Sequence, residues 1–112
     1  MRIALPVADG SLCQHFGHCT HFALFEVDDT QRAITSRNDH PAPRHEPGVF
    51  PTWLGEQGVT VVIAGGLGGR ARDMLVQQGI EVVVGAEPGD PASAVDAYLA
   101  GNLSTSPNFC EK

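Results

Sequence analysis

The second half of the chain alternates short apolar runs with amphipathic segments, and glycines separate one from the next. The runs at 59–64 and 80–84 are dominated by valine and isoleucine, which favours buried strands. The segments at 48–58, 70–78 and 90–101 carry apolar residues at helical spacing and stop at glycine, so each predicts a helix. This alternation predicts parallel strands joined by right-handed helical crossovers, with the helices covering the sheet.

The first half predicts three further strands, at 2–7, 22–27 and 33–37. The third follows the second after a short turn, so we expect these two to pair antiparallel. Residues 38–48 hold three prolines and two histidines without apolar periodicity, which indicates a loop. We therefore expect an α/β fold with a mixed five-stranded sheet and helices packed on it. It forms a single domain over 1–112, in which 102–112 is an extended tail.

The strand directions bring four loops to one edge of this sheet. If the first and third strands run parallel, right-handed crossovers keep the fourth and fifth parallel to them. The segments at 13–19, 40–45, 65–69 and 85–89 then all lie beyond the carboxyl ends of strands. Open α/β sheets place their ligands at such an edge, so we expect the functional site there.

The first of these loops concentrates metal-ligating side chains. It contains two thiols and two imidazoles within seven residues, the ligand types that zinc, copper and iron–sulfur centres select. His15 and His18 are three residues apart and Cys19 adjoins them, so we expect these three to bind metal. Cys13 stays open between ligand and buried thiol. Phe16 is expected to anchor the loop on the core.

Two more segments offer ligands to the same edge. His45 stands just before the first predicted helix and is a candidate ligand, or else a helix-entry residue. His40 has no motif around it and is expected to be solvated. Cys110 lies in a tail without a core-building pattern, so it could fold back and complete the site.

The glycine turn before the second helix is a candidate for anion contact. Gly65, Gly66 and Gly68 precede a helix N-terminus, where exposed amides and the helix dipole favour negative charge. The turn matches neither the dinucleotide fingerprint nor the phosphate loop, and close packing would also explain its glycines. An anionic metal–sulfide cluster would suit it.

Composition excludes several classes of function. The formal charge is −6 and the seven Lys and Arg residues form no cluster, so nucleic acid is not an expected ligand. No apolar stretch approaches the roughly 20 residues of a membrane span, and we expect a cytoplasmic protein without a membrane partner. Three cysteines are an odd number, which favours thiols available to a metal over a disulfide framework.

The chain resembles the dinitrogenase iron–molybdenum cofactor biosynthesis family, which includes cluster-binding orange-protein relatives. The most specific motif is Val-Val-Ile-Ala-Gly-Gly-Leu-Gly-Gly-Arg-Ala at 61–71. Met-Arg-Ile-Ala-Leu-Pro-Val, His-Phe-Gly-His-Cys and His-Glu-Pro-Gly also match, at 1–7, 15–19 and 45–48. The resemblance implies a ribonuclease H-like fold and a role in binding or delivering metal clusters rather than in turnover.

Carried over by position, the family pattern implies a ligand set of His15, His18, Cys19, His45 and Cys110. Similar sequences often end in cysteine, an acidic residue and histidine. Here Glu111 and Lys112 follow the cysteine, so a terminal imidazole is missing. The tail therefore departs from the family pattern, whereas the first loop matches it.

The hypothesis is a protein without enzymatic activity that binds a metal ion, or an iron–sulfur or iron–molybdenum type cluster, as carrier or accessory in metallocluster assembly. Its expected partners are cluster donor and recipient proteins, and a homodimer could share one metal site. One alternative is a zinc-stabilised regulatory or interaction module. A weaker one is a divalent-metal nuclease using Asp9, Asp39 and Asp90, which lie in turns rich in glycine and proline on an acidic chain.

Overall fold

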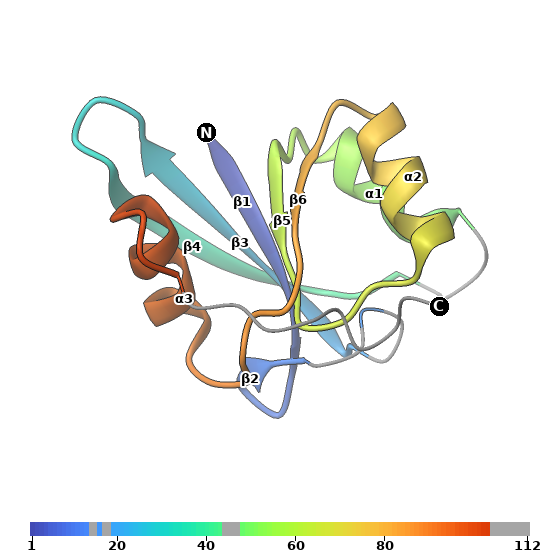
Figure 1. Ribbon diagram of the computed structural model, residues 1–112, viewed down its shortest axis with the longest axis horizontal. Helices are drawn as coiled ribbons and strands as arrows, with labels where there is room; N and C mark the ends of the chain where they lie inside the picture. Colours follow the sequence, from blue (N-terminus) through green and yellow to red (C-terminus); the bar gives the residue numbers. More distant parts are fainter. Residues whose placement is uncertain (14–15, 17–18, 44–47, 104–112) are drawn as a thin grey trace.

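The computed structural model of the protein is described here over residues 1–13, 16, 19–43 and 48–103. Within these residues one mixed sheet of six strands has the order β4-β3-β1-β5-β6, and the short β2 pairs with β1 (Figure 1). The elements in chain order are β1 (Arg2–Ala8), β2 (Ser11–Leu12), β3 (His21–Asp28), β4 (Ala33–Pro41), α1 (Val49–Glu56), β5 (Val61–Ile63), α2 (Gly69–Gln77), β6 (Glu81–Val83) and α3 (Pro91–Leu99).

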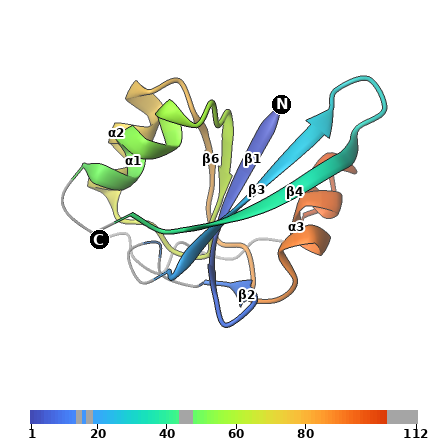
Figure 2. The ribbon, with the colours of Figure 1, turned by 180° about the vertical axis from the view of Figure 1, so that it is seen from behind.

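The sheet separates two hydrophobic cores, one under each set of helices. Helix α3 covers one face, while α1 and α2 cover the other (Figures 1 and 2). Successive residues of a strand point to opposite faces, so β1 contributes Ile3 and Leu5 to the α3 core and Ala4 to the other. A strand buried on both faces must be apolar throughout, which explains the uninterrupted apolar run near the N-terminus.

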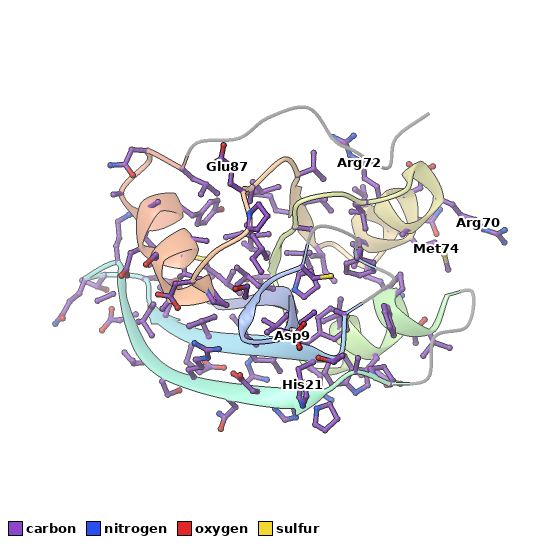
Figure 3. All side chains as sticks on the ribbon, turned by 90° about the horizontal axis from the view of Figure 1, so that it is seen from below. Asp9, His21, Arg70, Arg72, Met74 and Glu87 are labelled. Carbon is purple, nitrogen blue, oxygen red and sulfur yellow. The ribbon has the colours of Figure 1, made fainter. Side chains whose placement is uncertain are left out.

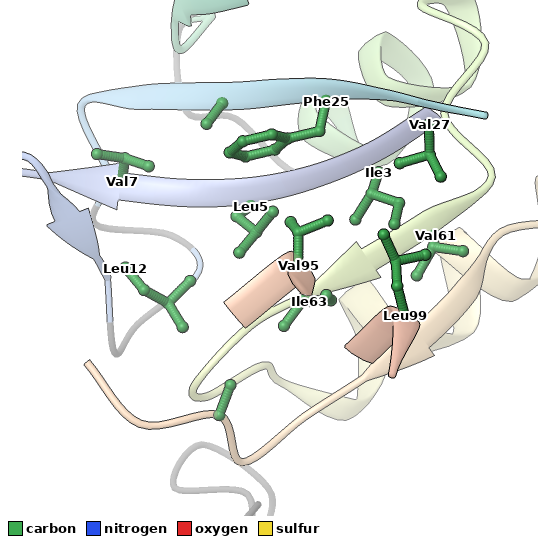
Figure 4. Close-up of a cluster of buried hydrophobic side chains, with 12 residues drawn as sticks. Ile3, Leu5, Val7, Leu12, Phe25, Val27, Val61, Ile63, Val95 and Leu99 are labelled. Atoms are coloured by element: carbon green, nitrogen blue, oxygen red, sulfur yellow. The ribbon is translucent and has the colours of Figure 1, made fainter. Parts of the chain in front are cut away.

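The core under α3 is built from branched aliphatic side chains around one phenylalanine. Val95 and Leu99 of α3 pack against Ile3, Leu5 and neighbouring strand residues (Figure 4). Leu12 of the short strand β2 closes one end of this cluster. The core under α1 and α2 is more aromatic, since Phe22 packs there against other rings.

The predicted strand directions are confirmed. Strand β1 pairs antiparallel with β3 and parallel with β5, β3 pairs antiparallel with β4, and β5 pairs parallel with β6. The carboxyl ends of β1, β4, β5 and β6 therefore lie at one edge of the sheet. The mixed α/β architecture with helices packed on a sheet is also as predicted.

Two features of the sheet differ from the prediction. It has six strands rather than five, because Ser11–Leu12 adds the short strand β2 beside the end of β1. Strand β4 runs on to Pro41, so the prediction of a loop from Asn38 onward was wrong, and His40 pairs with Phe22. Residues 38–41 have no apolar pattern because they lie on an exposed edge strand. Hydrogen bonds to β3, and not burial of side chains, hold their backbone in place.

The three helices occur where the glycine and proline pattern placed them. Helix α3 begins after Asp90, whose carboxylate accepts a hydrogen bond from the Ser93 backbone N–H at 3.2 Å, with Pro91 as first helical residue. Both features were predicted from the sequence. Among the described residues, no helix combines the length and apolarity that a membrane crossing requires.

Helix α3 is fastened to the sheet at its carboxyl end by polar contacts. The Tyr98 hydroxyl donates to the Glu81 carboxylate of β6 at 2.6 Å, and Arg32 Nε donates to the Leu99 carbonyl at 2.8 Å. Partial burial, followed by the Glu81 contact, raises the pKa of Tyr98 to about 12. The neutral hydroxyl is thus the form that the fold favours.

Replacing Phe22 with alanine should lower the free energy of unfolding by about 3–5 kcal/mol, because a fully buried ring is lost from an aromatic cluster. Val76→Ala is the control, since this side chain is 59% exposed and its loss should change stability by under about 0.5 kcal/mol. Chemical denaturation followed by circular dichroism measures both. Equal effects of the two substitutions would contradict the core assignment.

Tyr98 is the only tyrosine, so the absorbance of tyrosinate after a rapid pH jump reports this residue alone. We expect a pKa near 12 in the parent, moving partway toward 10.0 in Glu81→Gln. Because the folded-state pKa lies above the unfolded one, the stability contributed by the neutral Tyr98 hydroxyl is fully present below the unfolded pKa and is lost as the pH rises through about 12. An unchanged midpoint in Glu81→Gln would rule out the contact with Glu81 as a cause.

Candidate functional site

Backbone hydrogen bonds join the predicted site loops at the carboxyl edge of the sheet. The Phe16 N–H, in the first loop, donates to the Gly66 carbonyl at 3.0 Å. The Gly85 N–H donates to the Gly65 carbonyl at 2.8 Å. The first loop, the glycine turn before α2 and the turn after β6 are therefore neighbours, as the strand directions predicted.

The first loop is fixed at both ends and in its middle. The Cys13 N–H donates to the Pro6 carbonyl at 2.8 Å and the Thr20 N–H to the Val7 carbonyl at 2.9 Å, so both ends are tied to the end of β1. Between them Phe16 is buried against two aromatic rings of the core under α1 and α2, as the anchor role predicted. The described residues of this loop are therefore held at the carboxyl edge of the sheet.

Cys13 and Cys19 are both partly exposed and neither forms a disulfide. Burial raises the pKa of the Cys19 thiol from 9.0 to about 12, and the charge of Cys13 contributes to this rise. The two thiols therefore lie close enough to interact electrostatically. Cys13, left open by the sequence, thus belongs to the surroundings of the predicted ligand Cys19.

The other four predicted ligands, His15, His18, His45 and Cys110, lie outside the described residues. Among the residues that are described, no three or more histidine, cysteine, aspartate or glutamate side chains gather closely enough to hold a metal ion. The complete ligand set therefore stays a prediction, of which the structure places Cys19.

The glycine turn has room for a ligand at the N-terminus of α2. Gly68 has a φ of −66°, which any residue can adopt, and a Cβ on Gly68 or Gly69 would meet no atom of the described residues within 4 Å. Neither backbone strain nor packing within the described residues explains these two glycines. Close approach of a bound group to the backbone would explain them.

The charge around this turn suits an anion. Helix α2 has neither a side-chain cap nor an acidic residue in its first turn, so the positive end of the helix dipole is uncompensated by the helix itself. Arg70 and Arg72 follow within that first turn (Figure 3). An anionic metal–sulfur group could be bonded by thiols on one side and stabilised by the positively charged helix end on the other.

Two of the three carboxylates considered for a nuclease have other partners. Asp39 accepts two hydrogen bonds from Arg37, at 2.7 and 3.0 Å, and Asp90 caps α3. The Arg37 contact lowers the pKa of Asp39. Asp9 stands in the turn after β1 with a left-handed φ of 55°. The arrangement therefore gives no support to a three-carboxylate metal site.

Two histidines of the described segments lie differently from what the sequence indicated. His40, expected to be solvated in a loop, is in β4 and its ring is 6.0 Å from that of Trp53. His21 was not considered, yet it begins β3 at the edge next to the site (Figure 3). Its Nδ1 is 3.0 Å from the Thr20 hydroxyl. The sequence could have indicated His21 as a site residue, because it stands two residues after Cys19.

Comparison with known families agrees with these features. The model of the family described as dinitrogenase iron-molybdenum cofactor matches residues 1–101. The chain belongs to this family. The resemblance inferred from the motifs is thereby confirmed.

Known proteins resemble the chain in sequence, and solved structures share its fold over nearly the whole chain. The uncharacterized protein MJ0580 of Methanocaldococcus jannaschii is 29% identical over an alignment of 85 residues that covers 73% of this chain and 72% of that protein. The crystal structure of PH0822 has a TM-score of 0.85 at 25% identity, covering 95% of this chain and 96% of its own. The apo form of the orange protein from Desulfovibrio gigas has a TM-score of 0.70 at 25% identity, covering 96% and 93%.

The Cys19 thiol should alkylate slowly in the metal-free protein. A rise of its pKa from 9.0 to about 12 lowers the thiolate fraction at neutral pH by about a thousandfold, and thiolate is the reactive form. Iodoacetamide labelling followed by peptide mass spectrometry should show slow modification of Cys19 when native and fast modification after denaturation. Equal rates in the two states would contradict the buried environment of the thiol.

Proposed function

We propose that the protein binds a metal ion or a metal–sulfur cluster at the carboxyl edge of its sheet and acts as a carrier or accessory in metallocluster assembly. The observation that carries the proposal is the hydrogen bond from Phe16 to Gly66. It places the cysteine loop beside a glycine turn in which a Cβ at Gly68 would contact none of the described residues. Membership of the dinitrogenase iron-molybdenum cofactor family supports cofactor biosynthesis or binding as the setting.

Two groups of residues at this edge would hold such a cargo in different ways. Cys19, with His15, His18, His45 and Cys110 as the other proposed ligands, would bond the metal through sulfur and nitrogen. The backbone N–H groups at the start of α2, with Arg70 and Arg72, would offset the negative charge of a cluster. This local positive charge matters because the chain as a whole has a formal net charge of −6.

The state of the Cys19 thiol links cargo binding to pH. Its raised pKa means that a proton must leave when a metal takes the sulfur. Loading should therefore weaken as the pH falls. Such reversible binding suits a protein that passes its cargo on better than a closed structural zinc site, which keeps all four positions filled.

The finer features of the function follow from this role. The partners would be proteins that donate or receive the cluster, in the cytoplasm, with no enzymatic step on this chain. A shared metal site between two copies is one way to enclose a cluster that a single loop leaves open. A ribonuclease H-like assignment of the fold belongs to the same proposal, since it rests on the family resemblance.

Anaerobic reconstitution with iron and sulfide tests the proposal, with metal content and the absorption spectrum as readouts. The parent should acquire a coloured cluster, and Cys19→Ser should lose most of it. Gly68→Ala should reduce loading severalfold by filling the space beside the backbone, while its unfolding free energy stays within about 1 kcal/mol of the parent because the φ is ordinary. Val76→Ala, on the exposed face of α2, is the control and should load like the parent.

The alternatives give different results in the same preparations. A colourless protein with tightly held zinc would favour the zinc-stabilised module. Cleavage of an RNA–DNA hybrid with Mg²⁺, abolished by Asp9→Asn, would favour the nuclease. If the parent holds no metal and Cys19→Ser behaves like it, the proposed ligand fails.

A further inference from the structure

Strand β4 forms one edge of the sheet. In the strand order β4-β3-β1-β5-β6 it pairs with β3 on one side, and no strand of the described residues lies on the other. Seen from below, β4 runs along the outside of the molecule (Figure 3). It is nine residues long and mostly exposed, so its outer side is an extended row of backbone donors and acceptors.

The register shows which residues point their backbone groups outward. Met1 and Val27 each donate a backbone hydrogen bond to the other, at 3.3 and 2.9 Å. The backbone N–H and C=O groups of the odd-numbered residues of β3 therefore point toward β1, and those of the even-numbered residues point toward β4. Phe22 pairs with His40 across the β3–β4 ladder, so the even-numbered residues of β4 from 36 to 40 face β3. The N–H and C=O groups of Arg37 and Asp39 therefore point away from the sheet.

These two outward residues carry opposite charges. Their side chains form a bidentate ion pair at 2.7 and 3.0 Å and stay 34% and 42% exposed. The Arg37 guanidinium also lies 5.2 Å from the centre of the Phe25 ring. Both contacts hold Arg37 in place before any partner arrives, which reduces the entropy lost on association.

We propose that β4 pairs antiparallel with β4 of a second copy about a two-fold axis at Asn38. Three symmetric registers set Arg37 or Asp39 of one copy against Arg37 or Asp39 of the other. An axis at Arg37 sets arginine against arginine, and an axis at Asp39 sets aspartate against aspartate. Only the axis at Asn38 sets each Arg37 against the Asp39 of the other copy, twice by symmetry, with four backbone hydrogen bonds.

The opposite charges along β4 distinguish it from edge strands that are protected against pairing with another chain. Edge strands are commonly defended by charges of one sign, which repel a second copy. Opposite charges directly across an antiparallel pair stabilise it, and like charges destabilise it. An Arg and an Asp two residues apart on the outward side make the strand complementary to itself in a single register.

This pairing has a consequence for the proposed cargo site. The two copies of β4 run in opposite directions, so the carboxyl edges of the two sheets point to opposite ends of the dimer. Each copy would then bind metal by itself, and a site shared between two copies would require a different contact. The dimer thus goes beyond the proposed function, and the experiments that test the two proposals are independent of each other.

Cross-linking tests the register. In the proposed dimer the two Asn38 residues are a directly opposed, non-hydrogen-bonded pair, whose Cα atoms lie about 4.5 Å apart. That separation suits a disulfide. Asn38→Cys treated with oxidised glutathione should form a 38–38 disulfide, identified by peptide mass spectrometry. Ser36→Cys is the matched control and should form no 36–36 disulfide, since Ser36 would face His40 of the other copy.

A mixture of Ser36→Cys and His40→Cys chains should cross-link 36 to 40, in agreement with the same axis. The parent treated in parallel accounts for any disulfide of its three native cysteines. Equal homodisulfide yields at 36 and 38, or none at 38, would overturn the proposed register.

Sedimentation velocity over a concentration series tests the charges. The parent should dimerise at high concentration and low salt, and more weakly at high salt. Arg37→Asp should weaken dimerisation by about tenfold or more, because it sets like charges against each other twice. The exchange Arg37→Asp with Asp39→Arg should restore it. A parent that is monomeric throughout, or an Arg37→Asp variant that dimerises like the parent, would overturn the proposal.

Discussion

Strand β1 is held by hydrogen bonds on both of its sides, and the positions of the other elements follow from that. It pairs antiparallel with β3 and parallel with β5, and its end also takes up β2. Because both faces of β1 are buried, helices must cover the sheet on both sides. The same pairing fixes the directions of the remaining strands, so the loops beyond their carboxyl ends have to meet at one edge.

The carboxyl end of β1 also organises the candidate site. Pro6 and Val7 accept hydrogen bonds from the two ends of the cysteine loop, while Phe16 inserts into the aromatic core beneath it. The loop is thereby held against Gly66 on the turn before α2. The end of β1 and the aromatic core thus hold the loop on one side, whereas on the other side a Cβ at Gly68 or Gly69 would meet no atom of the described residues within 4 Å.

Much of the fold was predictable because burial leaves periodic marks in the sequence. The helices, the sequence of the main elements along the chain and the directions of the main strands followed from apolar runs, glycines and the Asp90 cap. The second part of β4 was missed, since an exposed edge strand has no apolar pattern and Asn38 to Pro41 resemble a loop. The edge of the sheet where the candidate loops meet was predictable, and the structure places Cys19 and the glycine turn there, while the role of these residues in a site stays a prediction. His15, His18, His45 and Cys110 remain predictions because they lie outside the described residues.

The sequence by itself determined which segments are buried, where helices begin and end, and that thiols and imidazoles concentrate before β3. These properties are local, because propensity, capping and hydrophobic period act over a few residues. Only the tertiary structure decided that Phe16 contacts the Gly66 backbone, and that Arg37 and Asp39 direct their backbone groups away from the sheet. Those facts depend on strand pairing between residues far apart in the chain, and a register shift of one residue would reverse which groups point outward.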